Sequence, residues 1–416
     1  MTKVKTKNKL SPKKRKNILI ITPYIPQLSQ SGGQRHSFYT VKYLSRNNNI
    51  TIICFSRSEE GLEELKKYCK KVILVKRGKT WDLRKILRAG FSLYPFLLIN
   101  YINKELKNAI QNEIDTGIYD LIHCDCLYPM PNIPKTNIPI ILVDVTIEYA
   151  IYQHYVETIK GWKKLISPLL WIDVLKLKYW ETKYWKNTNT VIMFSPTDKE
   201  FVEKITGRKD IKVFEDGVDP EYFNFPQKTE KSNYPSILFG TSNMKWMQNR
   251  ESVEMILEKY WPDIKKRYPT AKFYIIGRNA PEFFSKYATK DIIVAEADSE
   301  GQAHDPQYYY ELSWLLLAPM GSGGGTRNKF LEGMTFGLPV ITNPEGGMGN
   351  IKIKNYTHSI VCPNKDIIKN VFHLFDDKDY RLKMGKNARK LIKDNYAFDS
   401  SVDKLNDIYE QIYQNN

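Results

Sequence analysis

The strongest chemical signal in the sequence is a glycine cluster between two apolar segments that are typical of β-strands. Residues 314–318 precede the cluster and residues 339–342 follow it. Gly323, Gly324 and Gly325 can adopt backbone conformations closed to other residues and let a ligand approach closely. A helix that begins after them directs its unpaired N–H groups and the positive end of its dipole toward the cluster. This setting favours a phosphate or pyrophosphate group.

The residues that follow the glycines carry groups suited to both ends of a nucleotide sugar. Thr326, Arg327 and Lys329 can donate hydrogen bonds to phosphate oxygens, Arg as a two-pronged donor and Lys as a point charge. Glu332 can accept hydrogen bonds from sugar hydroxyl groups. The pattern is not a P-loop, in which Lys and then Ser or Thr follow the last glycine directly. We therefore predict a nucleotide-sugar site here, against the simpler alternative of a glycine-rich turn followed by surface cations.

Length and composition limit the class of protein. A chain of 416 residues with 42% hydrophobic residues suits two domains of roughly 200 residues. No segment has the ~20 predominantly apolar residues of a membrane-spanning helix. The first sixteen residues carry eight Lys or Arg and no acid, unlike a signal peptide. We expect a cytoplasmic protein, either free or at the inner face of the cell membrane.

The formal net charge of +17 raises the question of a polyanionic partner. Residues 1–16 contribute +8 of this charge, and we predict a disordered basic tail there. The sequence has no zinc-finger spacing, aromatic RNA-binding motif or basic zipper, so no nucleic-acid partner is expected. An anionic membrane surface or a diphosphate-containing substrate accounts for the charge at least as well. The five cysteines lack zinc-ligand spacing, and we expect them to be reduced and structural.

Short β-branched runs alternate with helical segments in two series, which is typical of parallel sheets covered by helices on both faces. The predicted fold class is α/β, with two doubly wound, Rossmann-like domains facing a cleft, and ligands are expected at the carboxyl ends of the strands. The predicted parts are a basic tail (1–16), an N-terminal domain (17–222), a linker (223–235), a C-terminal domain (236–395) and a helix that returns to the N-terminal domain (396–416). Strands are predicted at 17–22, 49–55, 72–75, 119–124, 139–145, 190–194 and 211–214, then at 236–239, 272–276, 291–294, 314–318, 339–342 and 359–361.

Seven sequence motifs, in a fixed order, resemble those of one enzyme family. They are Pro23–Pro26 with Ser31–His36 (P-x-x-P, then GG-x-R), Tyr119–His123 (YDvIH), Ser195–Asp198, Asp216–Asp219 (NGVD), Phe239–Asn249 (F-x-G…W-x-P-N), Ile276–Gly277 (ivG) and Gly323–Glu332 (GsGtr-x-KilEa). The chain therefore resembles the GT-B glycosyltransferases of retaining family 4 (glycosyltransferase group 1), from about Asn17 to Tyr413.

The resemblance implies that the C-terminal domain binds a nucleoside diphosphate sugar without a metal or other cofactor. It assigns Glu332 to the donor ribose, and the N-terminal domain to the acceptor. Gly324 stands where many members have an acid near the donor sugar, so the transferred sugar is not indicated. The donor-binding residues that it implies are Gly32, Gly33, Gly240, Lys245, Gly323, Gly324, Gly325, Thr326, Arg327, Lys329 and Glu332.

Catalytic candidates in the N-terminal domain follow the predicted strand 139–145. Asp144 and Glu148 stand at its cleft-facing end, where the family has a histidine or acidic group, and His154 follows six residues after Glu148. We expect a carboxylate here to assist deprotonation of the acceptor, unless the donor phosphate does so. The region from Lys79 to Trp185 mixes aromatic, basic and leucine residues, which suits either an interfacial helix near a lipid-linked saccharide or helices that pack on the sheet.

Other functions remain open at the level of the sequence. A GT-B nucleotide-sugar epimerase or a phosphorylase-like enzyme would share the site around Glu332. A basic scaffold that binds membrane or nucleic acid would explain the charge but not the glycine cluster. A nicotinamide-dependent dehydrogenase would need G-x-G-x-x-G after the first strand, where the sequence reads Ile-Ile-Thr-Pro-Tyr-Ile. Cell-surface polysaccharide or glycolipid assembly is the setting that we expect.

Overall fold

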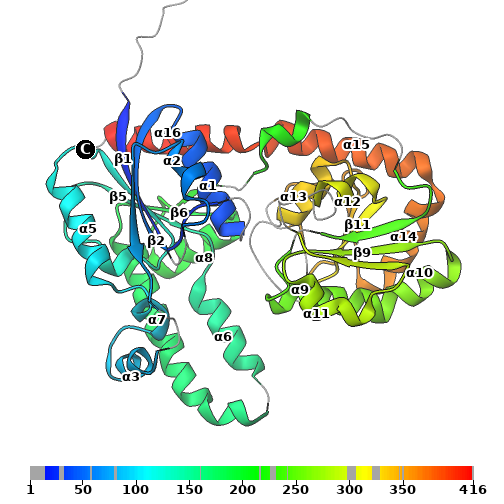
Figure 1. Ribbon diagram of the computed structural model, residues 1–416, viewed down its shortest axis with the longest axis horizontal. Helices are drawn as coiled ribbons and strands as arrows, with labels where there is room; N and C mark the ends of the chain where they lie inside the picture. Colours follow the sequence, from blue (N-terminus) through cyan, green and yellow to red (C-terminus); the bar gives the residue numbers. More distant parts are fainter. Residues whose placement is uncertain are drawn as a thin grey trace, which may run out of the picture.

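Two parallel β-sheets with helices on both faces form the protein, in a computed structural model (Figure 1). The structure describes residues 15–27, 32–56, 59–78, 82–159, 161–214, 217–224, 231–240, 242–297, 306–320, 328–345, 347–348 and 351–414. Within these ranges no helix is long and apolar enough to cross a bilayer. The α/β class and the two doubly wound sheets agree with the sequence-based prediction.

The first sheet has seven strands in the order β3-β2-β1-β4-β5-β6-β7. Its inner strands are almost fully buried and rich in Ile, Val and Leu because helices cover both faces. The strands are β1 Lys16–Thr22, β2 Asn48–Ser56, β3 Lys71–Lys76, β4 Leu121–Asp125, β5 Ile140–Asp144, β6 Thr190–Met193 and β7 Lys212–Val213. The helices are α1 Gly32–Leu44, α2 Leu62–Lys66, α3 Leu83–Phe91, α4 Phe96–Ile99, α5 Lys104–Asp115, α6 Glu148–Thr158, α7 Ser167–Asn187 and α8 Pro196–Thr206.

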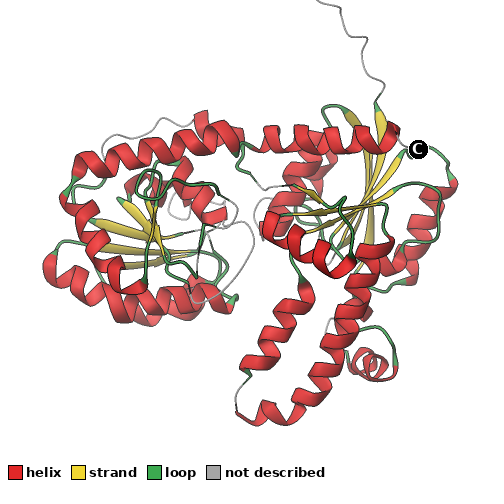
Figure 2. Ribbon diagram, turned by 180° about the vertical axis from the view of Figure 1, so that it is seen from behind, coloured by secondary structure: helices red, strands yellow, loops and turns green. Residues whose placement is uncertain are grey.

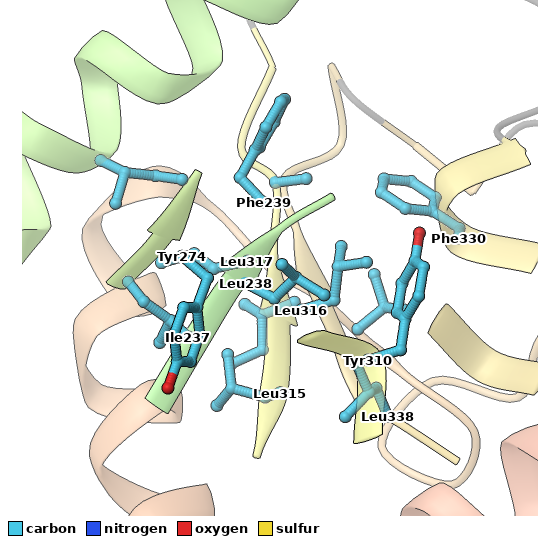
Figure 3. Close-up of a cluster of buried hydrophobic side chains, with 14 of the residues drawn as sticks. Ile237, Leu238, Phe239, Tyr274, Tyr310, Leu315, Leu316, Leu317, Phe330 and Leu338 are labelled. Carbon is cyan, nitrogen blue, oxygen red and sulfur yellow. The ribbon is translucent and has the colours of Figure 1, made fainter. Parts of the chain in front are cut away.

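The second sheet has six strands in the order β10-β9-β8-β11-β12-β13. Figure 3 shows its core, in which Leu238, Leu316 and Tyr310 pack together, with the Tyr310 hydroxyl on the side of Phe330. The strands are β8 Ser236–Phe239, β9 Lys272–Ile276, β10 Ile292–Ala295, β11 Leu315–Leu317, β12 Val340–Thr342 and β13 Ile360–Val361. The helices are α9 Met247–Met255, α10 Trp261–Arg267, α11 Ala280–Phe284, α12 Pro306–Leu312, α13 Asn328–Thr335, α14 Ile367–Asp376 and α15 Lys378–Asn395.

Every strand predicted from the sequence is present, with ends that differ by at most two residues. The largest shift is in β4, which begins at Leu121 instead of Tyr119. Tyr119 instead donates a hydrogen bond from its hydroxyl to Glu113 Oε2 at 2.6 Å, and Asp120 accepts one from the Asn17 backbone N–H at 2.8 Å. Both side-chain hydrogen bonds lie just before the strand. A prediction based on runs of apolar residues cannot detect them, so it started the strand too early.

The chain passes between the domains twice, and the two passages are bonded to each other. Val218 N–H donates to Tyr396 O at 2.9 Å, and Phe398 N–H donates to Val218 O at 2.8 Å. Asp219 accepts hydrogen bonds from the Tyr43 hydroxyl at 3.0 Å and from Lys42 Nζ at 3.3 Å. Residues 217–219 therefore contact both domains, which places the first passage before the predicted linker 223–235.

The last helix, α16 Phe398–Gln414, belongs to the core of the first domain. Phe398, Leu405 and Tyr409 are buried there, and the Tyr409 hydroxyl is bonded to His123 Nδ1 on β4. Burial lowers the pKa of His123 to about 3, so this histidine stays neutral. The C-terminal helix thus ties the far end of the chain to the first sheet (Figure 1).

Helices α6 and α7 extend away from the first sheet as an arm, next to α3 (Figures 1 and 2). The arm begins directly after β5, since α6 starts at Glu148. Glu181 on α7 is fully buried and accepts hydrogen bonds from the N–H groups of Glu148 and Tyr149 at 2.8 and 3.0 Å. It therefore satisfies the first turn of α6, which has no side-chain cap of its own.

Candidate active site

Glu332 lies where the two domains meet. It is the fifth residue of α13, its side chain is only 7% exposed, and one carboxylate oxygen accepts a hydrogen bond from the Tyr310 hydroxyl at 2.9 Å. The other oxygen accepts from Arg35 Nη1, which comes from α1 of the first domain. The carboxylate that we predicted to contact the donor ribose is therefore paired with a cation of the opposite domain.

A pocket surrounds this ion pair. Helix α1 contributes Arg35, His36 and Tyr39, the first passage between domains contributes Gly217, Val218 and Asp219, and helix α13 contributes Asn328 and Glu332. The Asn328 side-chain oxygen is buried and has no hydrogen-bond partner in the part of the chain that the structure describes. A buried acceptor of this kind is costly unless a donor reaches it.

Lys329 is not a surface cation. It is buried, and its Nζ donates a hydrogen bond to Asn249 Oδ1 at 2.8 Å and lies 4.3 Å from the centre of the Phe239 ring. Asn249 is in the first turn of α9 and Phe239 ends β8. The ammonium group is thus positioned at the carboxyl end of the second sheet, where doubly wound domains bind ligands.

The glycine cluster itself lies outside the described residues, as do the predicted contacts of Gly323, Gly324, Gly325, Thr326 and Arg327. Its two flanks are described. Met320 exchanges two hydrogen bonds of 2.8 Å with the Asn343 side chain, and α13 begins at Asn328. The residues on either side of the cluster are therefore anchored in the second domain.

Gly240 and Lys245 follow β8 at the same edge of the sheet. A Cβ atom on Gly240 would lie 3.1 Å from the Tyr310 hydroxyl, so the glycine leaves space for the group that binds Glu332. Lys245 is exposed in the turn before α9, and its backbone N–H donates to Asn243 Oδ1 at 2.9 Å. Of the two predicted cations described here, Lys329 is positioned by protein contacts and Lys245 faces solvent.

Gly32 and Gly33, which the resemblance assigns to donor binding, form the first turn of α1. A Cβ atom on Gly33 would lie 2.8 Å from the Tyr24 hydroxyl, so this contact requires glycine. The start of α1 also places Arg35 in its first turn, from which it reaches Glu332.

Asp144 does not face the cleft as predicted. It is buried at the end of β5, where one carboxylate oxygen accepts a hydrogen bond from the Trp185 indole N–H at 2.9 Å. Burial raises the pKa of Asp144 to about 8, with a further increase from the neighbouring Glu148 carboxylate. The side chain therefore links the sheet to α7, a role that the sequence pattern did not indicate.

Glu148 and His154 are separated by the geometry of α6. Glu148 is partly buried in the first turn, where it accepts hydrogen bonds from the Tyr128 hydroxyl at 2.5 Å and from Thr146 Oγ1 at 3.2 Å. Burial raises the pKa of Glu148 above its ordinary value. His154 is exposed further along the same helix. The structure does not bring His154 together with Asp144 and Glu148, because α6 leaves the sheet at Glu148 and carries the histidine along the arm.

The candidate list from the sequence omitted several residues that the structure brings together. Arg35 is the arginine of the GG-x-R motif, so its signal was present in the sequence. Tyr310 and Asn249 carry no comparable signal for contact with Glu332 and Lys329, because 22 and 80 positions separate each pair in the chain.

Comparisons with known proteins agree with this architecture. The family described as Glycosyl transferases group 1 matches residues 235–377. The chain is 22% identical over 264 residues to the uncharacterized glycosyltransferase MJ1069 of Methanocaldococcus jannaschii, over 57% of this chain and 63% of that protein. A solved glycosyltransferase from Rickettsia africae ESF-5 has a TM-score of 0.66 at 18% identity, over 97% of this chain and 100% of that chain. Anabaena Alr3699/HepE, solved in complex with UDP-glucose, has a TM-score of 0.62 at 11% identity, over 95% of this chain and 99% of that chain.

The matched family segment contains Glu332, Lys329 and the glycine cluster, and the solved structures share the arrangement of both sheets. The resemblance to the GT-B glycosyltransferases is confirmed for the fold, and the assignment to retaining family 4 stays a prediction. The chain has the GT-B fold, and its residues 235–377 match the family described as Glycosyl transferases group 1.

Proposed function

We propose that the protein is a retaining, metal-independent glycosyltransferase that uses a nucleoside diphosphate sugar as donor. The observation that carries the proposal is Glu332 at the pocket between the domains, on the helix that follows the glycine cluster. A carboxylate in this position can accept hydrogen bonds from both ribose hydroxyl groups. A basic scaffold that binds membrane or nucleic acid would leave this carboxylate and the glycine cluster without a use.

The diphosphate is assigned to the carboxyl end of the second sheet. Lys329 supplies positive charge there, and the N-terminus of α13 supplies the positive end of the helix dipole. Arg327, which lies outside the described residues, is the second cation that we propose. The preorganised dipoles and cations stabilise the charge that develops on the leaving diphosphate as the anomeric carbon gains oxocarbenium character. Because Anabaena Alr3699/HepE was solved with UDP-glucose, a uridine nucleotide is the first donor to test.

The acceptor is assigned to the carboxyl end of the first sheet and is a saccharide or lipid-linked saccharide. Its hydroxyl attacks from the face that the diphosphate leaves, so the anomeric configuration is retained. Glu148 is the proposed proton acceptor, with the donor phosphate as the alternative, since burial brings the pKa of Glu148 closer to neutrality. We place the reaction in cell-surface polysaccharide or glycolipid assembly, at the cytoplasmic face of an anionic membrane.

A thermal-shift panel of UDP, GDP, CDP, ADP and their sugars tests the donor site, with and without magnesium and with NAD as a control. A ligand that binds the native state raises the melting temperature. Stabilisation by one nucleoside diphosphate in the presence of a chelator is the expected result. If stabilisation required magnesium, the metal-independent mechanism would be wrong. If NAD alone raised the melting temperature, the assignment of a nucleoside diphosphate sugar as donor would be wrong. Proton NMR of the product then reports whether the anomeric configuration is retained.

A further inference from the structure

We propose that the outer surface of the helical arm is a docking surface for an anionic phospholipid bilayer. The arm surface consists of α3 with residues 92–93, α6, the 3-10 helix Gly161–Ile166 and residues 167–179 of α7. Among the described residues, twenty large apolar side chains are exposed, and thirteen of them belong to the arm surface. Apolar residues scattered singly need no explanation, but a concentration of this kind marks an interaction site.

Helix α7 has two apolar stripes, and only one of them packs on the protein. Val174, Leu177 and Trp185 are buried at helical spacing on one side of the helix, and Leu177 and Trp185 belong to the core beneath it. Leu169, Ile172 and Leu175 follow one another at the same spacing and are 68%, 51% and 62% exposed. A helix that is apolar on both sides is ordinarily buried on both sides. The second stripe therefore has no partner within the described part of the chain.

Helix α3 is amphipathic, but its apolar face points to solvent and not to its own domain. Its single buried residue is Ala89. Leu83, Leu87 and Phe91 repeat every four residues and lie on another side of the helix, where they are exposed by 70%, 55% and 94%. A short helix that directs its apolar face away from the protein is typical of binding in the plane of a membrane interface.

The two helices form one rigid unit. Lys176 Nζ on α7 donates a hydrogen bond to Ala89 O at 2.8 Å, and Trp180 Nε1 donates to Leu93 O at 2.9 Å. The rings of Trp180 and Tyr94 are stacked 4.1 Å apart. The arm surface is therefore held in shape before any partner arrives, so binding costs little conformational entropy.

The charge of the arm surface selects an anionic partner. Arg84 and Arg88 are exposed beside the apolar stripe of α3, and Lys164 and Lys178 are exposed on and before α7. Residues 161–187 contain six lysines and two acids, and both acids accept backbone hydrogen bonds within the protein. Apolar side chains among cations match the acyl boundary and the headgroups of an anionic leaflet.

The position of the arm suggests what membrane docking would achieve. This argument rests on the proposed function. Helix α6 leaves the carboxyl end of β5 at Glu148, so the arm joins the edge of the first sheet at which the acceptor is expected. A bilayer in contact with the arm surface would hold a lipid-linked acceptor near Glu148. Soluble acceptors gain nothing from this arrangement.

Co-sedimentation of the full chain with vesicles tests the proposal. Vesicles of phosphatidylcholine alone are compared with vesicles that also contain phosphatidylglycerol. We expect binding to the anionic vesicles and a loss of at least about tenfold in Leu169→Gln/Ile172→Gln/Leu175→Gln. The double variant Arg84→Gln/Arg88→Gln should also lose at least about tenfold in vesicle affinity, since each basic residue near an anionic membrane contributes about fivefold to binding. The matched controls are Ile118→Gln and Lys383→Gln/Lys386→Gln, which change exposed residues elsewhere and keep full binding.

Three results would overturn the docking surface. They are wild-type protein that ignores anionic vesicles, vesicle binding that both arm variants retain, and a dimer in sedimentation velocity that the triple variant converts to a monomer. The last result would assign the surface to a second copy of the chain. The donor-dependent thermal shift is measured on the same samples. If the arm variants keep the donor-dependent thermal shift, a negative vesicle result contradicts the docking surface but not the proposed function.

Discussion

Arg35 in the first turn of α1 and Glu332 on α13 form an ion pair that joins the two domains across 297 positions of sequence. The Tyr310 hydroxyl donates to the other oxygen of the same carboxylate. Without a nucleotide, both oxygens of Glu332 are thus satisfied by protein donors. The ribose hydroxyls would bind the same oxygens, each of which can accept a second hydrogen bond.

Replacing Glu332 tests the donor site directly. Glu332→Ala removes the acceptor for the ribose hydroxyls, and hydrogen bonds to a charged group are each worth about 1.5–3 kcal/mol. We expect Kd for the nucleoside diphosphate to rise by roughly 10- to 100-fold, measured by calorimetry. Glu254→Ala, which changes an exposed acid on α9, is the control. Unchanged affinity in Glu332→Ala would remove this carboxylate from the site.

Replacing Lys329 tests the diphosphate site. Lys329→Ala removes a buried ammonium group that Asn249 and Phe239 hold in place, and we expect kcat/KM for the donor to fall at least about tenfold. Lys329→Arg keeps the charge but not the fit, so it should recover only part of the activity. Lys383→Ala, on the exposed side of α15, serves as the matched change. Full turnover by Lys329→Ala would contradict the assignment.

Replacing Arg35 tests whether the ion pair holds the domains together. Arg35→Gln removes the positive partner of Glu332 and leaves a shorter, uncharged polar side chain. We expect a larger radius of gyration in small-angle scattering without donor, and a return to the wild-type value when the nucleotide is added. Arg46→Gln changes an exposed arginine after the same helix and should leave the scattering unchanged. Identical curves for Arg35→Gln and the wild type would show that other contacts set the domain separation.

Asp144 makes the stability depend on pH. Burial raises its pKa to about 8 in the folded protein, against about 3.9 in an unfolded chain. Between these values the folded state holds a proton that the unfolded state has released, so this group lowers the stability as the pH rises toward 8. Asp144→Asn still accepts the Trp185 hydrogen bond but cannot ionise. The melting temperature of Asp144→Asn, relative to that of the wild type, should increase as the pH rises from 5 to 8. The melting temperature of Asp263→Asn, at an exposed site on α10, should change with pH as that of the wild type does. Parallel profiles for Asp144→Asn and the wild type would rule out this linkage.

Gly277 is required by the contact between the ends of β8 and β9. A Cβ atom there would lie 2.1 Å from Ser242 O, which is backbone and cannot rotate away. We expect Gly277→Ala to lower the free energy of unfolding by about 1–3 kcal/mol in chemical denaturation. Gly90→Ala is the matched change, because nothing lies within 4 Å of the added atom and the site is helical. It should raise the stability by about 0.5–1 kcal/mol. Equal stability of the two variants would contradict the packing argument.

The sequence by itself determined where the strands of both domains lie and which residues of the second domain are candidates for donor binding. Buried parallel strands are nearly continuous runs of Ile, Val and Leu, so β1, β2 and β8 could be located from composition alone. Glu332 and Lys329 could be selected because a local pattern of glycines, cations and one acid is typical of a phosphate-binding helix start, which can be recognised without knowledge of distant contacts.

Tertiary structure alone decided which distant groups meet. Asp144 and Glu148 are equivalent acids in the sequence, but Asp144 is buried against Trp185 while Glu148 lies at the root of α6. The pairing of Arg35 with Glu332 depends on how the two domains are placed, which no local pattern encodes. The exposure of the arm is of the same kind, since helical spacing gives two apolar stripes on α7 and only packing shows which one is left open.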